Sequence, residues 1–416
     1  MTTVGDRVTD AAPTPRIGRN ELLALVSALM ALTAMGVDLM LDAFVDIREA
    51  FGLDADSNQT SQIITVFFFG LAIAHLFYGP LADRFGRKPV LYGGIVIYIL
   101  GAVGSAFAPT FELLLISRFV WGFGAAGPRV VATAVVRDRF EGVEMAKAMS
   151  QVMAVFVLVP VFAPGFGSLI LLVLPWPAVF WSCGIFAGFI GLWSVRLRET
   201  LAVADQREIT VSATVSGYSE VARTRVTFGY TIASVFLQGV FTAYLATVDL
   251  IVADVFDRES QFSIIFGAVA VFFGLGAIAN GRIVGRFGID AVVGRVFQIQ
   301  ALLVIALVAT TIAVQGHPDF WVFMPLVGVL LGSFMCLMPN LNSAAMGPVG
   351  HLAGSGAALT GAVRMAGGAV LGGFLASTVH GSLTPLVLGV AFLWGLAALT
   401  VWLVRTERRL TFSTGS

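Results

Sequence analysis

Apolar runs long enough to cross a lipid bilayer follow one another along almost the whole chain. Each is close to the roughly 20 residues that a helix needs to span the hydrocarbon core. The first six runs lie at about 22–45, 62–80, 89–108, 113–136, 149–172 and 174–195. After a polar stretch, six more lie at about 228–252, 262–284, 296–314, 320–343, 356–379 and 383–404. The pattern therefore predicts an all-α membrane protein with 12 transmembrane helices.

The composition supports this interpretation. Of the 416 residues, 57% are hydrophobic and 12% are charged, with a mean hydropathy of +0.90, whereas soluble domains carry roughly twice that share of charge. The formal net charge is zero, so a nucleic-acid partner is not indicated. Cys183 and Cys336 lie in separate apolar runs, and they predict neither a disulfide nor a metal site.

Basic residues are concentrated in alternate loops. With the N-terminus inside, only Arg48 and Arg258 lie outside, and 20 of the 25 Lys and Arg residues are cytoplasmic, as the positive-inside rule requires. We expect a cytoplasmic tail at 1–20, an N-terminal bundle at 21–200, a cytoplasmic linker at 201–226, a C-terminal bundle at 227–405 and a cytoplasmic tail at 406–416.

The segment GPLADRFGRKPVL at 79–91 matches the pattern found between the second and third helices of the major facilitator superfamily. NGRIVGRFG at 280–288 occupies the same place in the second half. The resemblance implies two pseudo-symmetric six-helix bundles and an inner lock that holds the halves together in the outward-open state. The lock residues are those of the motif: Gly79, Asp83, Arg84, Gly86 and Arg87.

A second resemblance covers RFVWGFGAAGPRVVATAVVRDRF at 118–140, which is similar to the fourth helix of the Bcr/CflA drug-resistance branch. Trp121 stands where that branch commonly has Gln. Further similarity runs through 36–44, 196–201 and 339–361, and so through nearly the whole chain. The resemblance implies an exporter of drugs or small organic metabolites in the bacterial inner membrane, working as a monomer.

PVFAPGFG at 160–167 resembles the antiporter motif of helix five in the superfamily. Pro160 and Pro164 remove backbone donors and bend the helix. Gly165 and Gly167 permit close helix packing. An ordinary kinked helix is the alternative, because Pro and Gly are both frequent in membrane spans.

Charged residues within the predicted spans are the main functional signal. They are Asp38, Asp42, Arg118, Arg129, Asp249 and Arg364. A charge at the bilayer centre costs about 2.5 to 3.5 kcal/mol on the mildest scale. Most of these side chains should therefore line a cavity or pair with one another.

Asp38 and Arg118 lie at similar depths from the outer ends of their helices, so an ion pair between them is expected. Both match residues of the family pattern, which implies that Asp38 carries the proton and Arg118 modulates its affinity. Asp42, one helical turn above Asp38, is a further coupling candidate. The alternative is a fixed bridge that only holds helices together.

Other residues are candidates for the substrate cavity. Asp249 faces either the cavity or the wet interface, and Arg129 and Arg364 either face the cavity or extend toward the cytoplasm. If both arginines face the cavity, they favour a substrate with a carboxylate or phosphate group. Polar candidates that are more often helix-packing contacts are Gln62, Gln151, Gln238, Tyr244 and Asn340.

The chain lacks a GxxxxGK[ST] loop and metal-ligand spacing, so we expect no cofactor and H⁺ as the coupling ion. The leading hypothesis is a proton-coupled antiporter that exports its substrate. A proton-coupled importer or exchanger of small organic anions is the alternative. A membrane-embedded enzyme or a sensor is a third class, but no constellation of nucleophile, base and orienting group is visible, so an enzyme is not expected.

Overall fold

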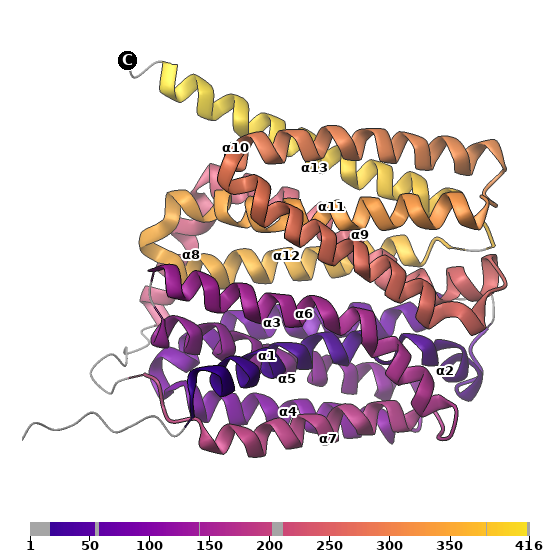
Figure 1. The fold of residues 1–416 in the computed structure, drawn as a ribbon, viewed down its shortest axis with the longest axis horizontal. Coiled ribbons are helices and arrows are strands. Elements are labelled where there is room, and N and C mark those ends of the chain that lie inside the picture. The colour runs from indigo at the N-terminus through magenta and orange to yellow at the C-terminus, as the bar shows by residue number, and fades with distance from the viewer. Residues whose placement is uncertain (1–16, 55–57, 141, 202–210, 380, 414–416) are drawn as a thin grey trace, which may run out of the picture.

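The computed structural model describes residues 17–54, 58–140, 142–201, 211–379 and 381–413, and within these ranges every regular element is a helix (Figure 1). The first half contains α1 (Arg19–Asp38), η1 (Leu41–Ala43), α2 (Phe44–Ala50), η2 (Asn58–Ser61), α3 (Gln62–Phe85), α4 (Arg87–Ala106), α5 (Phe111–Arg139), α6 (Gly142–Leu171), α7 (Pro177–Trp193) and η3 (Ser194–Arg196). The predicted all-helical fold is confirmed.

The predicted linker contains α8 (Val211–Arg223), which leads into the second half. That half contains α9 (Arg225–Leu250), η5 (Ile251–Val255), η6 (Glu259–Gln261), α10 (Phe262–Ala313), α11 (Phe320–Met346), η7 (Gly347–Leu352), α12 (Ala353–Ala376) and α13 (Thr384–Ser413). Of the two predicted tails, 1–16 and 414–416 lie outside the described residues, and 406–413 continue α13.

The helices agree with the predicted spans. Of the described chain, 10 helices are long and apolar enough to cross a membrane. α10 accounts for two predicted spans, because the chain turns at Gly288, where φ is 77°. A positive φ of this kind is readily adopted only by glycine. α6 covers the fifth predicted span.

Both halves run along the same long axis, one beside the other (Figure 1). α1 begins and α13 ends at one end of the bundle, which we call the tail end; α8 also lies there. α2 lies at the opposite end, which we call the far end. The halves meet where α3 packs against α12 and where α6 packs against α10.

The outer surface carries large apolar side chains. Ile185, Leu302 and Phe374 are 70%, 71% and 70% exposed. Such a surface is unusual in a soluble monomer, whereas in a bilayer it faces lipid tails that are equally apolar. The chain is a multi-pass membrane protein.

Candidate functional site

Asp38 is the last residue of α1, where the first span breaks before η1. Its side chain is 4% exposed. Within the described parts of the chain it forms neither an ion pair nor a hydrogen bond. The nearby hydroxyl of Tyr244 in α9, which also lacks a hydrogen-bond partner there, interacts with it electrostatically. A carboxylate in this setting is costly unless a proton or a cation neutralises it.

Arg118 does not pair with Asp38, contrary to the prediction. Its side chain is fully buried in α5, and its Nη2 donates a hydrogen bond to the carbonyl oxygen of Gly36 in α1, at 2.9 Å. The guanidinium lies 4.6 Å from the ring centroids of both Phe67 and Trp121, within cation–π range. A backbone carbonyl and aromatic faces therefore hold this charge inside the first half. Its expected effect on proton affinity stays a prediction.

Asp42 takes part in a polar link between the halves at the far end. Its carboxylate accepts a hydrogen bond from the Ser168 hydroxyl of α6, and that hydroxyl also hydrogen-bonds to Ser263 of α10. Because α6 belongs to the first half and α10 to the second, the two serines connect them directly. Neither serine was predicted as a site residue from the sequence.

Asp249 lies near the end of α9 and is 2% exposed. Its Oδ2 is buried and lacks a hydrogen-bond partner among the described residues. Three carboxylates act on it electrostatically, and one cation opposes them: Asp42, Asp254, Glu259 and Arg48. The buried position places Asp249 in the protein interior at the far end, among other carboxylates, and not in the wet interface.

Two arginines and a histidine from three helices form a second polar layer. His75 of α3, Arg129 of α5 and Arg364 of α12 each lie about ten residues from the tail-end terminus of their helix, which corresponds to roughly 15 Å of helix rise. Both arginines act electrostatically on His75, and Arg364 acts on Arg129. The predicted cavity arginines therefore face the same region.

The remaining cavity candidates lie elsewhere. Gln62 and Gln151 have exposed side chains. Gln238 donates to the Thr242 hydroxyl one turn further along α9, at 3.5 Å. Asn340 donates to the Asn280 side-chain oxygen, at 2.6 Å, and so joins α11 to α10 within the second half. For Gln238 and Asn340, the helix-packing alternative fits this structure.

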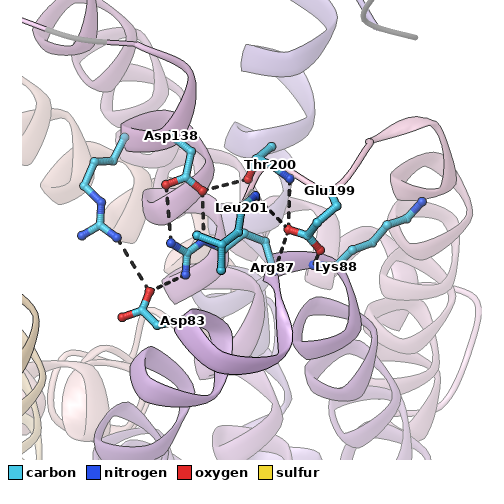
Figure 2. Close-up of polar contacts among 8 residues, drawn as sticks. Asp83, Arg87, Lys88, Asp138, Glu199, Thr200 and Leu201 are labelled. Atoms are coloured by element: carbon cyan, nitrogen blue, oxygen red, sulfur yellow. Dashed lines mark hydrogen bonds and ion pairs between the residues drawn. The ribbon is translucent and has the colours of Figure 1, made fainter. Parts of the chain in front are cut away.

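The motif residues between α3 and α4 form a charge network at the tail end (Figure 2). Arg87 is 3% exposed; its Nη1 lies 2.6 Å from Asp83 Oδ1 and its Nε lies 2.9 Å from Asp138 Oδ2. Arg137 approaches Asp83 to 4.0 Å. The Thr200 hydroxyl donates to Asp138, at 2.8 Å. Each of these residues belongs to the first half.

Among the described residues this network does not reach the second half, so the predicted lock between halves is not formed there. Asp83 and Arg87 pair with each other and with Arg137 and Asp138 of α5, so these ion pairs hold α3, α4 and α5 together. Gly79 has open space around it, and Arg84 stacks on Phe85 of its own helix, 5.2 Å from the ring centroid. Neither contributes to the network.

Glu199 completes this network from the segment after η3. Its carboxylate accepts hydrogen bonds from the backbone N–H groups of Arg87 and Lys88, both at 2.9 Å. These are the first N–H groups of α4, and a negative charge at a helix N-terminus is stabilising. Gly86, with φ at 92°, makes this turn possible; a Cβ there would also lie 2.7 Å from Glu199 Oε2.

The proline and glycine motif lies inside α6, with Pro160 and Pro164 both within the helix. A Cβ added to Gly167 would lie 2.2 Å from the carbonyl oxygen of Leu39, so α6 and α1 touch at this glycine. Gly165 has no atom within 4 Å of the same position. Of the two glycines, only Gly167 is required for close packing in this structure.

Two six-helix halves with buried charges between them are the architecture typical of secondary transporters. The chain belongs to the Major Facilitator Superfamily, whose model matches residues 23–371. It is therefore a transporter and not an enzyme.

Relatives support the predicted branch. The chain is 27% identical over 365 residues to a bicyclomycin resistance protein homolog of Haemophilus influenzae, covering 86% of this chain and 89% of that protein. It is 36% identical over 178 residues to the multidrug resistance protein MdtL of Escherichia coli, covering 42% and 45%. The partially occluded, inward-open structure of the E. coli xylose transporter XylE shares the fold, with a TM-score of 0.72, 13% identity and coverage of 92% and 98%.

Proposed function

We propose that this chain is a proton-coupled antiporter that exports drugs or small organic metabolites by alternating access. The names of its bicyclomycin and multidrug resistance relatives support an exported drug-like substrate. Transporters built from two such halves expose a central site to one side of the membrane and then to the other. The tail end faces the cytoplasm of a bacterial inner membrane, and the transporter works as a monomer.

The observation that carries the proposal is Asp38. This carboxylate is buried where the first span breaks, next to Tyr244 of the other half, and no cation of the described residues pairs with it. A proton is then the partner that can neutralise it. When the far end opens, Asp38 takes up a proton from outside; when the tail end opens, it releases that proton to the cytoplasm. The hydrogen bond between Ser168 and Ser263 at the far end is expected in the state in which the tail end is open.

The test is proton flux in everted vesicles that hold an acid-inside pH gradient. Adding a substrate from a panel of drug-like compounds should dissipate the gradient with the wild-type protein, and Asp38→Asn should abolish that effect. Asp46→Asn makes the same chemical change on an exposed carboxylate of α2 and should behave like wild type. Substrate-driven proton flux that survives in Asp38→Asn would refute Asp38 as the carrier.

The alternative is a proton-coupled importer or exchanger of small organic anions. Arg129 and Arg364 support an anionic substrate, and this feature is compatible with either direction of transport. Right-side-out vesicles separate the two directions. An antiporter expels substrate from them when the outside is acidic, whereas a proton-coupled importer accumulates it under the same gradient.

A further inference from the structure

Arg129 and Arg364 carry more positive charge than their surroundings neutralise. In the described chain neither guanidinium forms an ion pair or a side-chain hydrogen bond, and the Nε of Arg364 is buried without a partner. His75 uses its Nδ1 on the carbonyl oxygen of Leu71, at 2.7 Å. Two unpaired arginines at this depth are unusual, because buried charges normally pair.

The geometry brings these side chains to the boundary between the halves. α3 packs against both α5 and α12, so His75 lies between the helices that carry the arginines. A Cβ on Gly361, one turn before Arg364, would lie 3.9 Å from the His75 ring. Arg129 also faces Phe156 of α6, with 5.8 Å from its guanidinium carbon to the ring centroid. The region therefore combines two guanidinium groups with the aromatic ring of Phe156.

Energetics favour an anion there. Two like charges that act on each other raise each other's cost, and a charge withdrawn even partly from water without a partner is unfavourable. The planar guanidinium group matches a carboxylate with two parallel N–H···O bonds. Both arginine side chains are only partly buried, so their N–H groups keep surface that a ligand can reach.

We propose that Arg129 and Arg364, beside the His75 ring, form an anion site that binds the carboxylate of an aromatic or apolar organic acid. The proposal rests on the proposed function, because it names the substrate class of that antiporter. The proposal places the substrate and the proton at different sites. Asp38 lies about nine residues further toward the far end than the anion site, which corresponds to roughly 14 Å of helix rise. The carboxylate substrate and the proton then do not compete for one side chain. Each affects the binding of the other through the net charge between the two halves.

The test is binding to the purified full chain in detergent. The probes are benzoate, 2-naphthoate and indole-3-acetate, each beside its neutral primary amide. The carboxylates should bind and raise the melting temperature, and the amides should bind at least 10-fold more weakly. Arg129→Gln and Arg364→Gln should each weaken carboxylate binding about 10- to 100-fold, the range for a hydrogen bond to a charged group. Arg286→Gln, which changes an exposed arginine, is the matched control.

Stability without ligand gives an independent outcome. Because Arg129 and Arg364 are unpaired, either Gln variant should melt at the same or a higher temperature than wild type when no carboxylate is present. Three results overturn the site: equal binding of acids and amides, no binding of any carboxylate, or wild-type binding in both Gln variants.

The failures of the two proposals differ. Carboxylate binding that persists while no compound dissipates the pH gradient retains the anion site and rejects coupled antiport. A neutral compound that dissipates the gradient through Asp38, with no carboxylate binding, retains antiport and rejects the anion site.

Discussion

Arg48 of α2 forms an ion pair with Asp254 of η5, with 3.1 Å between its Nη1 and the carboxylate Oδ2. The pair crosses from the first half to the second at the far end, close to the buried carboxylate of Asp249. A partly exposed pair of this kind is worth about 0.2 to 1 kcal/mol. Because the ion pair links the two halves, it stabilises the state in which the far end is closed.

Arg48→Ala should therefore shift the population toward opening at the far end, by about 1.5- to 5-fold. Spin labels at Val173 and Val314, which are 79% and 47% exposed, would report a larger share of long distances, in a background where the two buried cysteines are replaced. The charge swap Arg48→Asp with Asp254→Arg should restore part of the wild-type distribution. Arg258→Ala, whose guanidinium lies 4.6 Å from the Phe320 ring centroid within the second half, is the control; an equal shift there would contradict the prediction.

The contact between α6 and α1 at Gly167 gives a second prediction. Gly167→Ala places a methyl group against the Leu39 carbonyl oxygen, so the helices must separate next to Asp38. We expect a lower melting temperature and at least 10-fold slower transport in vesicles. Gly165→Ala, where the space is open, should retain both. Equal losses in the two variants would mean that the motif needs glycine for flexibility and not for helix contact.

Glu199 should be a stabilising residue of the tail-end network. Glu199→Ala removes the acceptor of the Arg87 and Lys88 N–H groups, and losing such a helix cap costs about 0.5 to 2 kcal/mol. Hydrogen exchange at these two amides should accelerate, with a lower melting temperature. Glu199→Gln keeps an oxygen acceptor without the charge and should lie between wild type and Glu199→Ala. Unchanged exchange in Glu199→Ala would exclude the capping role.

The fold followed from the sequence because hydrophobic run length alone determines where a chain can cross a bilayer. The internal duplication was also visible. Gly86 and Gly288 occupy matching places in the segments 79–91 and 280–288. Both adopt positive φ angles, 92° and 77°. Turns of this kind can be predicted from the sequence because they depend on neighbouring residues only.

The partners of the buried charges could not be predicted in the same way. Arg118 uses the backbone oxygen of Gly36, and any residue could supply such an oxygen, so no sequence pattern marks it. Ser168 and Ser263 are ordinary serines until α6 and α10 meet. One signal was available: Trp121 departs from the family pattern, and its indole now lies on the Arg118 guanidinium.

Arg118 provides the sharpest separation between a structural and an electrostatic role. Arg118→Lys keeps the positive charge but loses the planar group that donates to the Gly36 oxygen and stacks on Phe67 and Trp121. If the arginine chiefly holds α1 and α5 together, this variant should melt at a clearly lower temperature, because an unsatisfied buried carbonyl oxygen costs about 1 to 3 kcal/mol. Melting curves of the purified protein measure this loss.

Arg286→Lys makes the same change at an exposed position and should leave the melting temperature unaltered. The pH dependence of substrate-driven proton flux then tests the other role. If the charge of Arg118 tunes the proton affinity of Asp38, Arg118→Lys should keep the wild-type pH profile, since lysine is also cationic, whereas Arg118→Gln should displace it. A normal melting temperature together with a normal profile in Arg118→Lys would contradict the structural role, because the contacts to Gly36 and Trp121 would then contribute nothing measurable.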